Sequence, residues 1–236
     1  MDSLINGLNA ARHSFYREVA DAVCARVPVG SILDIGTGRG VLPLMIAEKN
    51  VRLKAYGIDI SQKAVSAARK SAGKSGLSNS PQFDAGNVCS LPYKDEFFDL
   101  AVSTFSLHHW PDKAAGLNEI HRVLKPGGEA WICDHWKDPS PEAKQQLKRD
   151  FGCLAAWFAI AHLRMVHSAM TPDTARSIQE DPSLKFQDKR METSSIYLLL
   201  ERLCEKHSPD FIADRPGYYG FITYTLFSGR VPSSRK

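Results

Sequence analysis

The chain has 236 residues, of which 43% are hydrophobic and 24% are charged, a balance typical of a globular protein and not of a disordered or fibrous one. Its length predicts a single domain. Thirty Lys and Arg against 26 Asp and Glu give a formal net charge of +4, spread along the chain, which argues against a nucleic-acid-binding protein.

Helices and strands are predicted to alternate along the first 135 residues. Apolar residues recur at helical spacing over 1–28, and the following SILDIG predicts a strand that stops at a glycine. The pattern continues with a helix over 40–49, a strand over 53–59, a helix over 62–72, strands near Gln82 and over 97–103, a helix over 113–124, a KPGG turn and a strand over 129–135. Such alternation predicts a mostly parallel sheet with helices on both faces.

Beyond His135 the alternation changes. A long helical stretch within 139–170 is interpreted as an inserted cap, and TPDTARSIQED follows it. A strand near 184–192, a helix over 194–206 and a final strand over 219–229 would complete the sheet.

The segment LDIGTGRG, which begins at Leu33, raises the question of which ligand it binds. Its three glycines let the backbone bend sharply and approach a ligand where a side chain would collide: Gly36, Gly38 and Gly40. Their GxGxG spacing is one residue shorter than the GxGxxG of dinucleotide-binding folds. Asp34 precedes the turn and would repel a pyrophosphate but attract an ammonium group. The sequence therefore predicts a ligand that carries a cation at this turn.

A second acid, Asp59, ends the second predicted strand, 23 residues after Gly36. This is close to the offset of roughly 20 residues at which an acid binds ribose hydroxyls in nucleoside-binding folds. A ribose joined to an amino acid, without phosphates, describes S-adenosylmethionine. In their order along 31–135, LDIGTGRG, GIDIS, LPYKDEFFDLAVSTFSLHHWPD and RVLKPGG resemble the motifs of class I S-adenosylmethionine-dependent methyltransferases. The closest resemblance is to the branch that includes ubiquinone and menaquinone biosynthesis enzymes and many small-molecule methyltransferases.

The resemblance implies an α/β fold, a doubly wound, Rossmann-like, mostly parallel seven-stranded sheet with a helical insertion after strand 5. Within one domain, 1–236, it divides the chain into an N-terminal helix, a cofactor-binding core, a cap and a completion of the sheet: 1–28, 29–136, 139–170 and 171–230.

The resemblance also implies S-adenosyl-L-methionine as the cofactor, and roles for particular residues. Asp34 would hold the ammonium group directly or through water, Asp59 would bind the ribose diol, and Ile60 would pack on the adenine. The methionine portion would be lined by Gly36, Thr37 and Gly38, and by the backbone near Ser103 and Thr104. Tyr16 of the leading helix would close over this pocket.

One departure from the family concerns the adenine. Family members often have an acid after the third strand that accepts the adenine amino group, as in GDV..LPY, and this chain has GNVCSLPY. This places Asn87 at the acid's position with Val88 beside it, and an Asn carbonyl can still accept that hydrogen bond. An alternative alignment through Asp84 stays open.

Methyl transfer from a sulfonium needs mainly alignment and exclusion of water, because the methyl group is already electrophilic. His108 and His109 follow the fourth strand and are candidate general bases for a hydroxyl acceptor, or else structural histidines. Asp134 and His135 are candidate substrate contacts at the same rim, and Asp99 is expected to order the start of the fourth strand. The set of His108, His109, Asp134 and His135 matches no established spacing of metal ligands, so no metal is predicted.

The predicted partner is a small-molecule methyl acceptor, with no nucleic acid and no membrane span. Aromatic and apolar residues of the cap would favour an acceptor of aromatic or lipid character, although they could equally form core or a homodimer contact: Trp157, Phe158, His162 and Met165. Five separated cysteines and the lack of a secretory signal predict a cytoplasmic protein. The spacing of the glycines disfavours an NAD-dependent dehydrogenase. The alternative function is a cofactor-binding regulatory or scaffold protein that keeps the fold without turnover.

Overall fold

A computed structural model of the protein describes residues 2–135, 171–186, 188–195 and 223–230, with four isolated positions at 145, 148, 149 and 153. Over these residues the chain forms a seven-stranded sheet in the order β3-β2-β1-β4-β5-β7-β6. The predicted cap over 139–170 lies outside the described residues, apart from the isolated positions.

Five strands run parallel and include the predicted motifs: β1 (Gly30–Ile35), β2 (Leu53–Asp59), β3 (Gln82–Ala85), β4 (Phe98–Thr104) and β5 (Leu124–His135). Two further strands complete the sheet, with β7 (Thr223–Arg230) lying antiparallel between β5 and β6 (Asp188–Ser195). The predicted α/β class and mostly parallel sheet are confirmed.

The winding of the sheet reverses at β1. From β1 the chain proceeds outward to β2 and β3, and then returns to place β4 on the other side of β1. Ile35, the last residue of β1, pairs with Ile58 of β2 and Ser103 of β4, so the three strands end at one edge. Ligands of doubly wound sheets bind in the crevice at such a switch point, outside the carboxyl ends of the strands.

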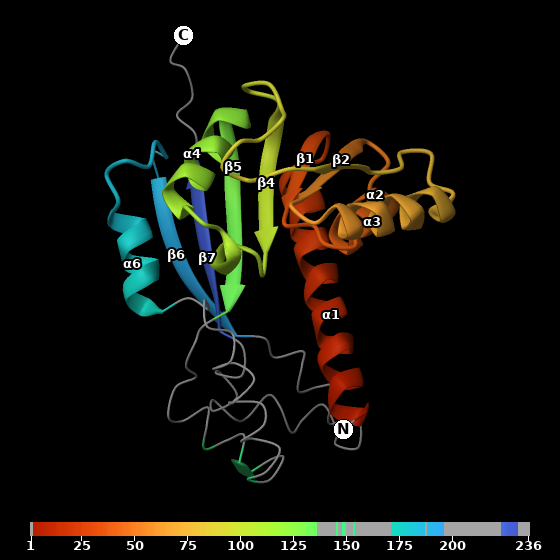
Figure 1. Ribbon diagram of the computed structural model, residues 1–236, viewed down its shortest axis with the longest axis horizontal. Coiled ribbons are helices and arrows are strands. Elements are labelled where there is room, and N and C mark those ends of the chain that lie inside the picture. Colours follow the sequence, from red (N-terminus) through yellow and green to blue (C-terminus); the bar gives the residue numbers. More distant parts are fainter. Residues whose placement is uncertain are drawn as a thin grey trace.

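Helices cover both faces of the sheet (Figure 1). Successive strand residues point to opposite faces, and accordingly Ile32 packs in one cluster with residues of α1 (Asp2–Arg26) and α2 (Val41–Lys49). The next residue, Leu33, packs in another cluster with residues of α4 (Lys113–Val123) and α6 (Pro172–Glu180). A third, small cluster packs α3 (Gln62–Ser75) against β3.

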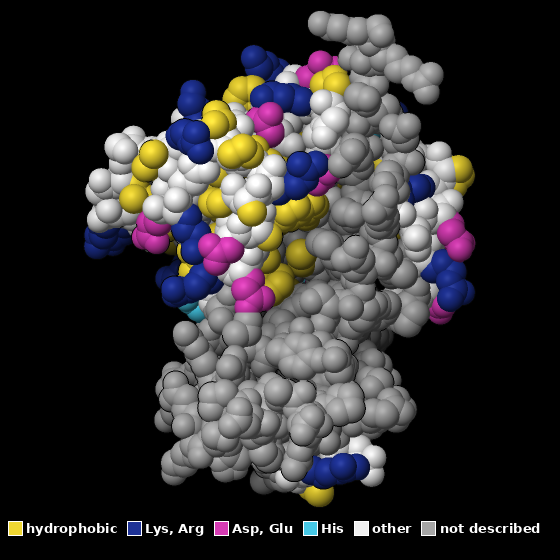
Figure 2. Space-filling view, turned by 180° about the vertical axis from the view of Figure 1, so that it is seen from behind, with side chains coloured by type: hydrophobic (Ala, Val, Ile, Leu, Met, Phe, Trp, Pro, Cys, Tyr) yellow, Lys and Arg dark blue, Asp and Glu magenta, His cyan; other side chains and the backbone are white. Residues whose placement is uncertain are grey.

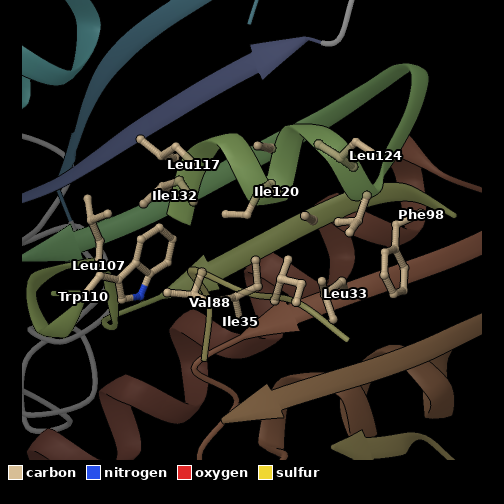
Figure 3. Close-up of a cluster of buried hydrophobic side chains, with 14 of the residues drawn as sticks. Leu33, Ile35, Val88, Phe98, Leu107, Trp110, Leu117, Ile120, Leu124 and Ile132 are labelled. Atoms are coloured by element: carbon tan, nitrogen blue, oxygen red, sulfur yellow. The ribbon is translucent and has the colours of Figure 1, made fainter. Parts of the chain in front are cut away.

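The cluster around Leu33 reaches the carboxyl edge of the sheet (Figure 3). Leu117 and Ile120 of α4 face the strands, and Trp110 lies beside Val88 and Leu107. Trp110 follows the 3-10 helix η1 (Leu107–His109), so this buried indole anchors the segment that leads from β4 into α4.

The molecular surface seen from behind the view of Figure 1 carries mixed charge. Figure 2 shows Lys and Arg interspersed with Asp and Glu over the described part of this face. Two ion pairs in the structure are Lys49 with Asp21, at 2.5 Å, and Arg26 with Glu129, at 2.6 Å. Among the helices that the structure describes, none is both long and apolar enough to cross a membrane.

Two predicted elements are corrected. The KPGG segment belongs to β5, although Gly127 has a φ of 79° and the register with β4 shifts between Phe98 and Leu100. The strand predicted near 184–192 is β6 and extends to Ser195, which removes the start of the helix predicted over 194–206. Leu184 and Phe186 precede β6 and are buried in the core, so their apolar character reflected packing of a loop and not a strand.

Candidate active site

A cavity of about 290 Å³ lies at the carboxyl ends of β1 and β2. Its size is at the lower end of the range of roughly 300–1,000 Å³ for small-molecule sites. Five of the residues predicted to bind a cofactor line it: Gly36, Asp59, Ile60, Asn87 and Val88. His109 also lines the cavity, and the lining residues that the sequence reasoning missed are Ile35, Ile58, Gly86, Phe105, Ser106, Trp110 and Pro111.

The three glycines of the turn have left-handed backbones but different surroundings. A Cβ on Gly36 would collide with the Cβ of Ser106, and a Cβ on Gly40 would lie 2.6 Å from the ring of Phe83. A Cβ on Gly38, in contrast, would meet no atom within 4 Å. Protein packing therefore requires a glycine at positions 36 and 40, whereas Gly38 is the one of the three that faces open space.

Asp34 and Thr37 form a buried polar pair beside this turn. Asp34 is only 2% exposed, and its Oδ1 and the Thr37 Oγ1 make no hydrogen bond within the described residues. Burial raises the pKa of the Asp34 carboxyl to about 7, with the nearby Thr37 hydroxyl opposing the shift and Asp59 adding to it. Buried polar atoms without partners are costly, so this pair suits a ligand group that is cationic and donates hydrogen bonds.

Asp59 joins the glycine turn to the start of α3. Its Oδ2 accepts a hydrogen bond from the backbone N–H of Gly38 and its Oδ1 accepts one from Ser61, both at 2.8 Å. The carboxylate lines the cavity, and each oxygen has capacity for a further hydrogen bond, as a ribose diol would require. Beside it, Ile60 lines the cavity and is 76% exposed, so its apolar side chain is accessible to a ligand.

The structure distinguishes the two candidates for the adenine contact. Asn87 lines the cavity, and its Oδ1 accepts a hydrogen bond from the backbone N–H of Cys89 at 3.0 Å. Asp84 does not line it, because its carboxylate accepts a hydrogen bond from Tyr93 at 3.0 Å and lies 3.7 Å from the Arg69 guanidinium. The alignment through Asn87 is therefore the one that places a side chain at the cavity.

The wall after β4 begins two residues later than expected. Ser103 and Thr104 are buried and do not line the cavity, because β4 continues through Thr104. Ser106 lines it instead and has a hydroxyl that connects three segments. This hydroxyl donates to the Ile35 carbonyl at 3.0 Å, accepts from Trp110 Nε1 at 3.1 Å and lies 2.7 Å from the Ser103 hydroxyl.

Tyr16 reaches the cavity only through another ring. Its ring centroid lies 6.2 Å from that of Phe105, and the Phe15 centroid lies 5.1 Å from Phe105. Phe105 lines the cavity, whereas Tyr16 does not. The expected closure of Tyr16 over the pocket is thus replaced by a contact behind the cavity wall. Phe105 has a φ of 56°, a conformation that its sequence context does not signal.

The two histidines have different surroundings. His108 is buried, its Nδ1 lies 2.6 Å from Asp134 Oδ1, and its backbone N–H donates to Asp134 Oδ2 at 2.9 Å. His109 lines the cavity, with its ring centroid 3.9 Å from that of His108. Desolvation lowers the pKa of His109 and the neighbouring His108 adds to this, while Asp134 and Asp59 oppose the shift.

The other polar candidates near the strand ends are structural in this arrangement. Asp134 is fully buried against His108, so its predicted position at the rim is corrected. The side chain of His135 lies outside the described residues. Asp99 accepts a hydrogen bond from the Ser31 backbone and pairs with Lys125, each at 2.8 Å, which confirms that it orders the start of β4. In the described part of the chain, no group of three or more His, Cys, Asp or Glu is placed to hold a metal ion.

A second cavity, of about 240 Å³, lies at the opposite end of the sheet, where β4 and β5 begin. Its charged lining residues pair with one another: Arg26 with Glu129 at 2.6 Å and Lys125 with Asp99 at 2.8 Å. The cavity at the carboxyl ends, with its partnerless buried polar atoms nearby, is the better candidate for chemistry.

Comparison with known proteins decides the family. Residues 28–194 match the family described as "Methyltransferase domain", which spans more than half of the chain. The chain belongs to this methyltransferase family. The family match thus agrees with the family that the four sequence motifs indicated.

Two curated relatives illustrate the family. A 27-O-demethylrifamycin SV methyltransferase from Amycolatopsis mediterranei is 32% identical over 157 residues, covering 63% of this chain and 57% of the relative. A 2-phytyl-1,4-naphtoquinone methyltransferase from Nostoc punctiforme is 30% identical over 149 residues, covering 62% of this chain and 65% of the relative. The matched part therefore spans less than two thirds of the length of each relative.

A solved structure shows how widely the fold is used. The [4+2]-cyclase SpnF is 23% identical to this methyltransferase-family chain, with a TM-score of 0.59, covering 92% of this chain and 82% of SpnF. This likeness shows a shared fold, and SpnF is named as a cyclase. Function must consequently be argued from the site and not from the fold.

Proposed function

We propose that this protein transfers a methyl group from S-adenosyl-L-methionine to a small-molecule acceptor by in-line displacement, giving S-adenosylhomocysteine. The observation that carries the proposal is the buried, partnerless pair of Asp34 Oδ1 and Thr37 Oγ1 beside the open face of Gly38. An amino-acid ammonium group would supply the charge and the hydrogen bonds that this pair lacks. The neighbouring cavity, which Asp34, Thr37 and Gly38 do not themselves line, offers Asp59 for a ribose diol.

The cofactor, when bound, supplies an electrophilic methyl group. Asp34 and Thr37 would bind its ammonium group, Asp59 its ribose hydroxyls, and Asn87 the edge of its adenine. Ile60 and Val88 provide apolar surface for the adenine ring. These contacts orient the reactive atoms and exclude water, which is most of what transfer from a sulfonium requires.

For an acceptor that must lose a proton, the two histidines are the proposed bases. His109 lines the cavity, and its lowered pKa keeps the imidazole neutral and able to accept a proton at neutral pH. The ring of His108 does not line the cavity; it lies against Asp134, 2.6 Å from Nδ1 to Oδ1, and beside the ring of His109. A carbon or amine acceptor that is already nucleophilic would need neither histidine.

The acceptor is proposed to be a small organic molecule. The names of the two curated relatives, a rifamycin methyltransferase and a naphthoquinone methyltransferase, support this because both refer to small organic acceptors. A cytoplasmic location and a homodimer stay predictions from the sequence. The alternative, a regulatory or scaffold protein that binds the cofactor without turnover, is compatible with the cofactor cavity and differs only in the acceptor.

Calorimetric titration tests the proposal directly. The purified protein is expected to bind S-adenosylmethionine and S-adenosylhomocysteine with micromolar affinity, and not NAD. Absence of binding by either would remove the proposed cofactor site. Turnover to S-adenosylhomocysteine in the presence of quinone, phenol and amine acceptors would then separate an enzyme from a scaffold, which binds without turnover.

A further inference from the structure

The backbone of Phe105 is held in an uncommon conformation at the cavity wall. Its φ is 56°, and Glu96 is the one other non-glycine residue with positive φ in the described part of the chain. Bulky side chains rarely adopt this left-handed region, and such residues persist where the surrounding structure determines them, often at functional sites.

Contacts from two sides determine this conformation. The backbone N–H of Phe105 donates to the Cys133 carbonyl at 2.8 Å, which extends the pairing of β4 with β5 by one residue. The ring packs against Phe15 and Tyr16 of α1, with centroid separations of 5.1 and 6.2 Å. With its backbone fixed on the sheet and its ring fixed by α1, Phe105 still lines the cavity.

Phe105 is also adjacent to the proposed methionine end of the site. The next residue, Ser106, lies so close to Gly36 that no Cβ fits between them. Phe105 thus lines the same cavity as Gly36 and is joined directly to the residue that contacts the glycine turn, where the amino-acid half of the cofactor is proposed to lie. The carboxylate nearest to that half, Asp34, is assigned to the ammonium group.

The charge of the cofactor's sulfur needs a different partner. Among the described lining residues the sole carboxylate is Asp59, which already accepts two backbone hydrogen bonds and is assigned to the ribose. The face of an aromatic ring carries negative electrostatic potential and attracts a cation without the desolvation of a second carboxylate. A ring at this position is chemically suited to a sulfonium.

We propose that Phe105, supported by Phe15 and Tyr16, presents its ring to the sulfonium of the cofactor and makes the site favour S-adenosylmethionine over S-adenosylhomocysteine. The product is a neutral thioether and gains nothing from the ring's electrostatics, so the same contact promotes exchange of product for fresh cofactor. This inference rests on the proposed function, because it needs the cofactor to occupy this cavity.

The test is the ratio of two dissociation constants, measured by calorimetry for S-adenosylmethionine and S-adenosylhomocysteine. Phe105→Leu is expected to reduce the preference for S-adenosylmethionine by about 2- to 30-fold, the range of cation–π contacts. Phe105→Tyr, which retains an aromatic face, should restore it. Phe97→Leu is the matched control, because Phe97 packs on Tyr56 and Phe98 and does not line the cavity.

A fluorinated ring separates electrostatics from shape. Trifluorophenylalanine introduced at position 105 keeps a ring of similar shape but removes the negative potential of its face. It should weaken the binding of S-adenosylmethionine and leave the binding of S-adenosylhomocysteine unchanged. This variant also serves if Phe105→Leu does not fold. Equal weakening of both ligands would overturn the inference and leave Phe105 as a shape-determining residue. If the unaltered protein binds neither ligand, the proposed function itself fails.

Discussion

Gly36 and Ser106 touch so closely that the glycine cannot carry a side chain. Gly36 directly follows the first strand and Ser106 follows the fourth, so this contact sets the separation of the two segments that border the cavity. The hydroxyl of Ser106 adds a hydrogen bond to the Ile35 carbonyl at 3.0 Å. The glycine turn is thus fixed by a neighbouring strand before any ligand binds.

From this contact we predict different effects for two glycine substitutions. Gly36→Ala should destabilise the fold by about 2–5 kcal/mol, because the left-handed backbone costs roughly 1–2 and overpacking roughly 1–3. Gly38→Ala carries the backbone cost alone, since its Cβ meets open space, but it should weaken cofactor binding. Urea unfolding and calorimetry check the pair. Equal losses of stability would contradict the assignment of Gly36 to packing.

Asp59→Ala should weaken binding of S-adenosylmethionine by about 1–3 kcal/mol, the cost of polar contacts left unmade. Part of the loss is indirect, because Asp59 also holds the Gly38 N–H at 2.8 Å. Asp59→Asn retains an acceptor for that N–H and should bind with intermediate affinity. Affinities measured for both variants, each shown to be folded by circular dichroism, test this order. Unchanged affinity in Asp59→Ala would remove Asp59 from the site.

Binding of the cofactor should depend on pH through Asp34. The pKa of its carboxyl is raised to about 7 in the free protein, mainly by burial, whereas an ammonium group binds the carboxylate. Affinity should therefore fall up to tenfold per unit as pH decreases below about 7. Asp34→Asn should bind weakly at every pH and lose this slope. A slope that persists in the variant would assign the proton to another group.

The Asp34 carboxyl also makes the stability of the free protein depend on pH, but here a lower pH is stabilising whereas it weakens cofactor binding. Because its folded pKa exceeds the unfolded value near 4, the folded state retains a proton that the unfolded state releases. The stabilisation from this proton is complete below about pH 4 and is lost as pH rises through about 7. Urea midpoints of Asp34→Asn and the unaltered protein, compared across this range, isolate the contribution. A constant difference would contradict the raised pKa.

The adenine contact predicts a matched pair of variants. Asn87→Ala should weaken cofactor binding by about 1 kcal/mol or more, since it removes a polar group at the cavity. Asp84→Ala should leave the affinity unchanged, because this carboxylate pairs with Tyr93 and Arg69 instead. Calorimetry at one pH measures both. The reverse order of effects would favour the alternative alignment through Asp84.

His108 and His109 are expected to contribute to rate and not to cofactor affinity if the acceptor loses a proton. His109→Gln should lower the rate substantially, with little change in the dissociation constant of S-adenosylmethionine. Asp134→Ala should lower the rate as well, and in addition it should destabilise the fold by several kcal/mol, because it removes the carboxylate that contacts the buried His108. Single-turnover rates and unfolding curves separate the effects. Unchanged rates in both would make the histidines structural.

The amino-acid sequence by itself determined the class of fold and indicated where along the chain a ligand site would lie. Alternating patterns require a parallel sheet, and such sheets place ligands at the carboxyl ends of their strands. Asp34, the glycine turn and Asp59 follow two of these ends, so their local order was sufficient to predict a ligand with ribose and a cation. The hydrogen bond from the Gly38 N–H to Asp59, in contrast, was found only in the structure.

Contacts between distant segments were decided only by the tertiary structure. The atoms that a Cβ on Gly36 would meet belong to Ser106, 70 positions further along the chain. Asp134 points into the interior, where its carboxylate contacts His108, which follows the neighbouring strand β4. The left-handed turn of Phe105 likewise depends on β5 and α1, and nothing in its neighbouring residues requires it. Local periodicity determines which face a residue occupies, whereas these roles arise from partners that periodicity does not specify.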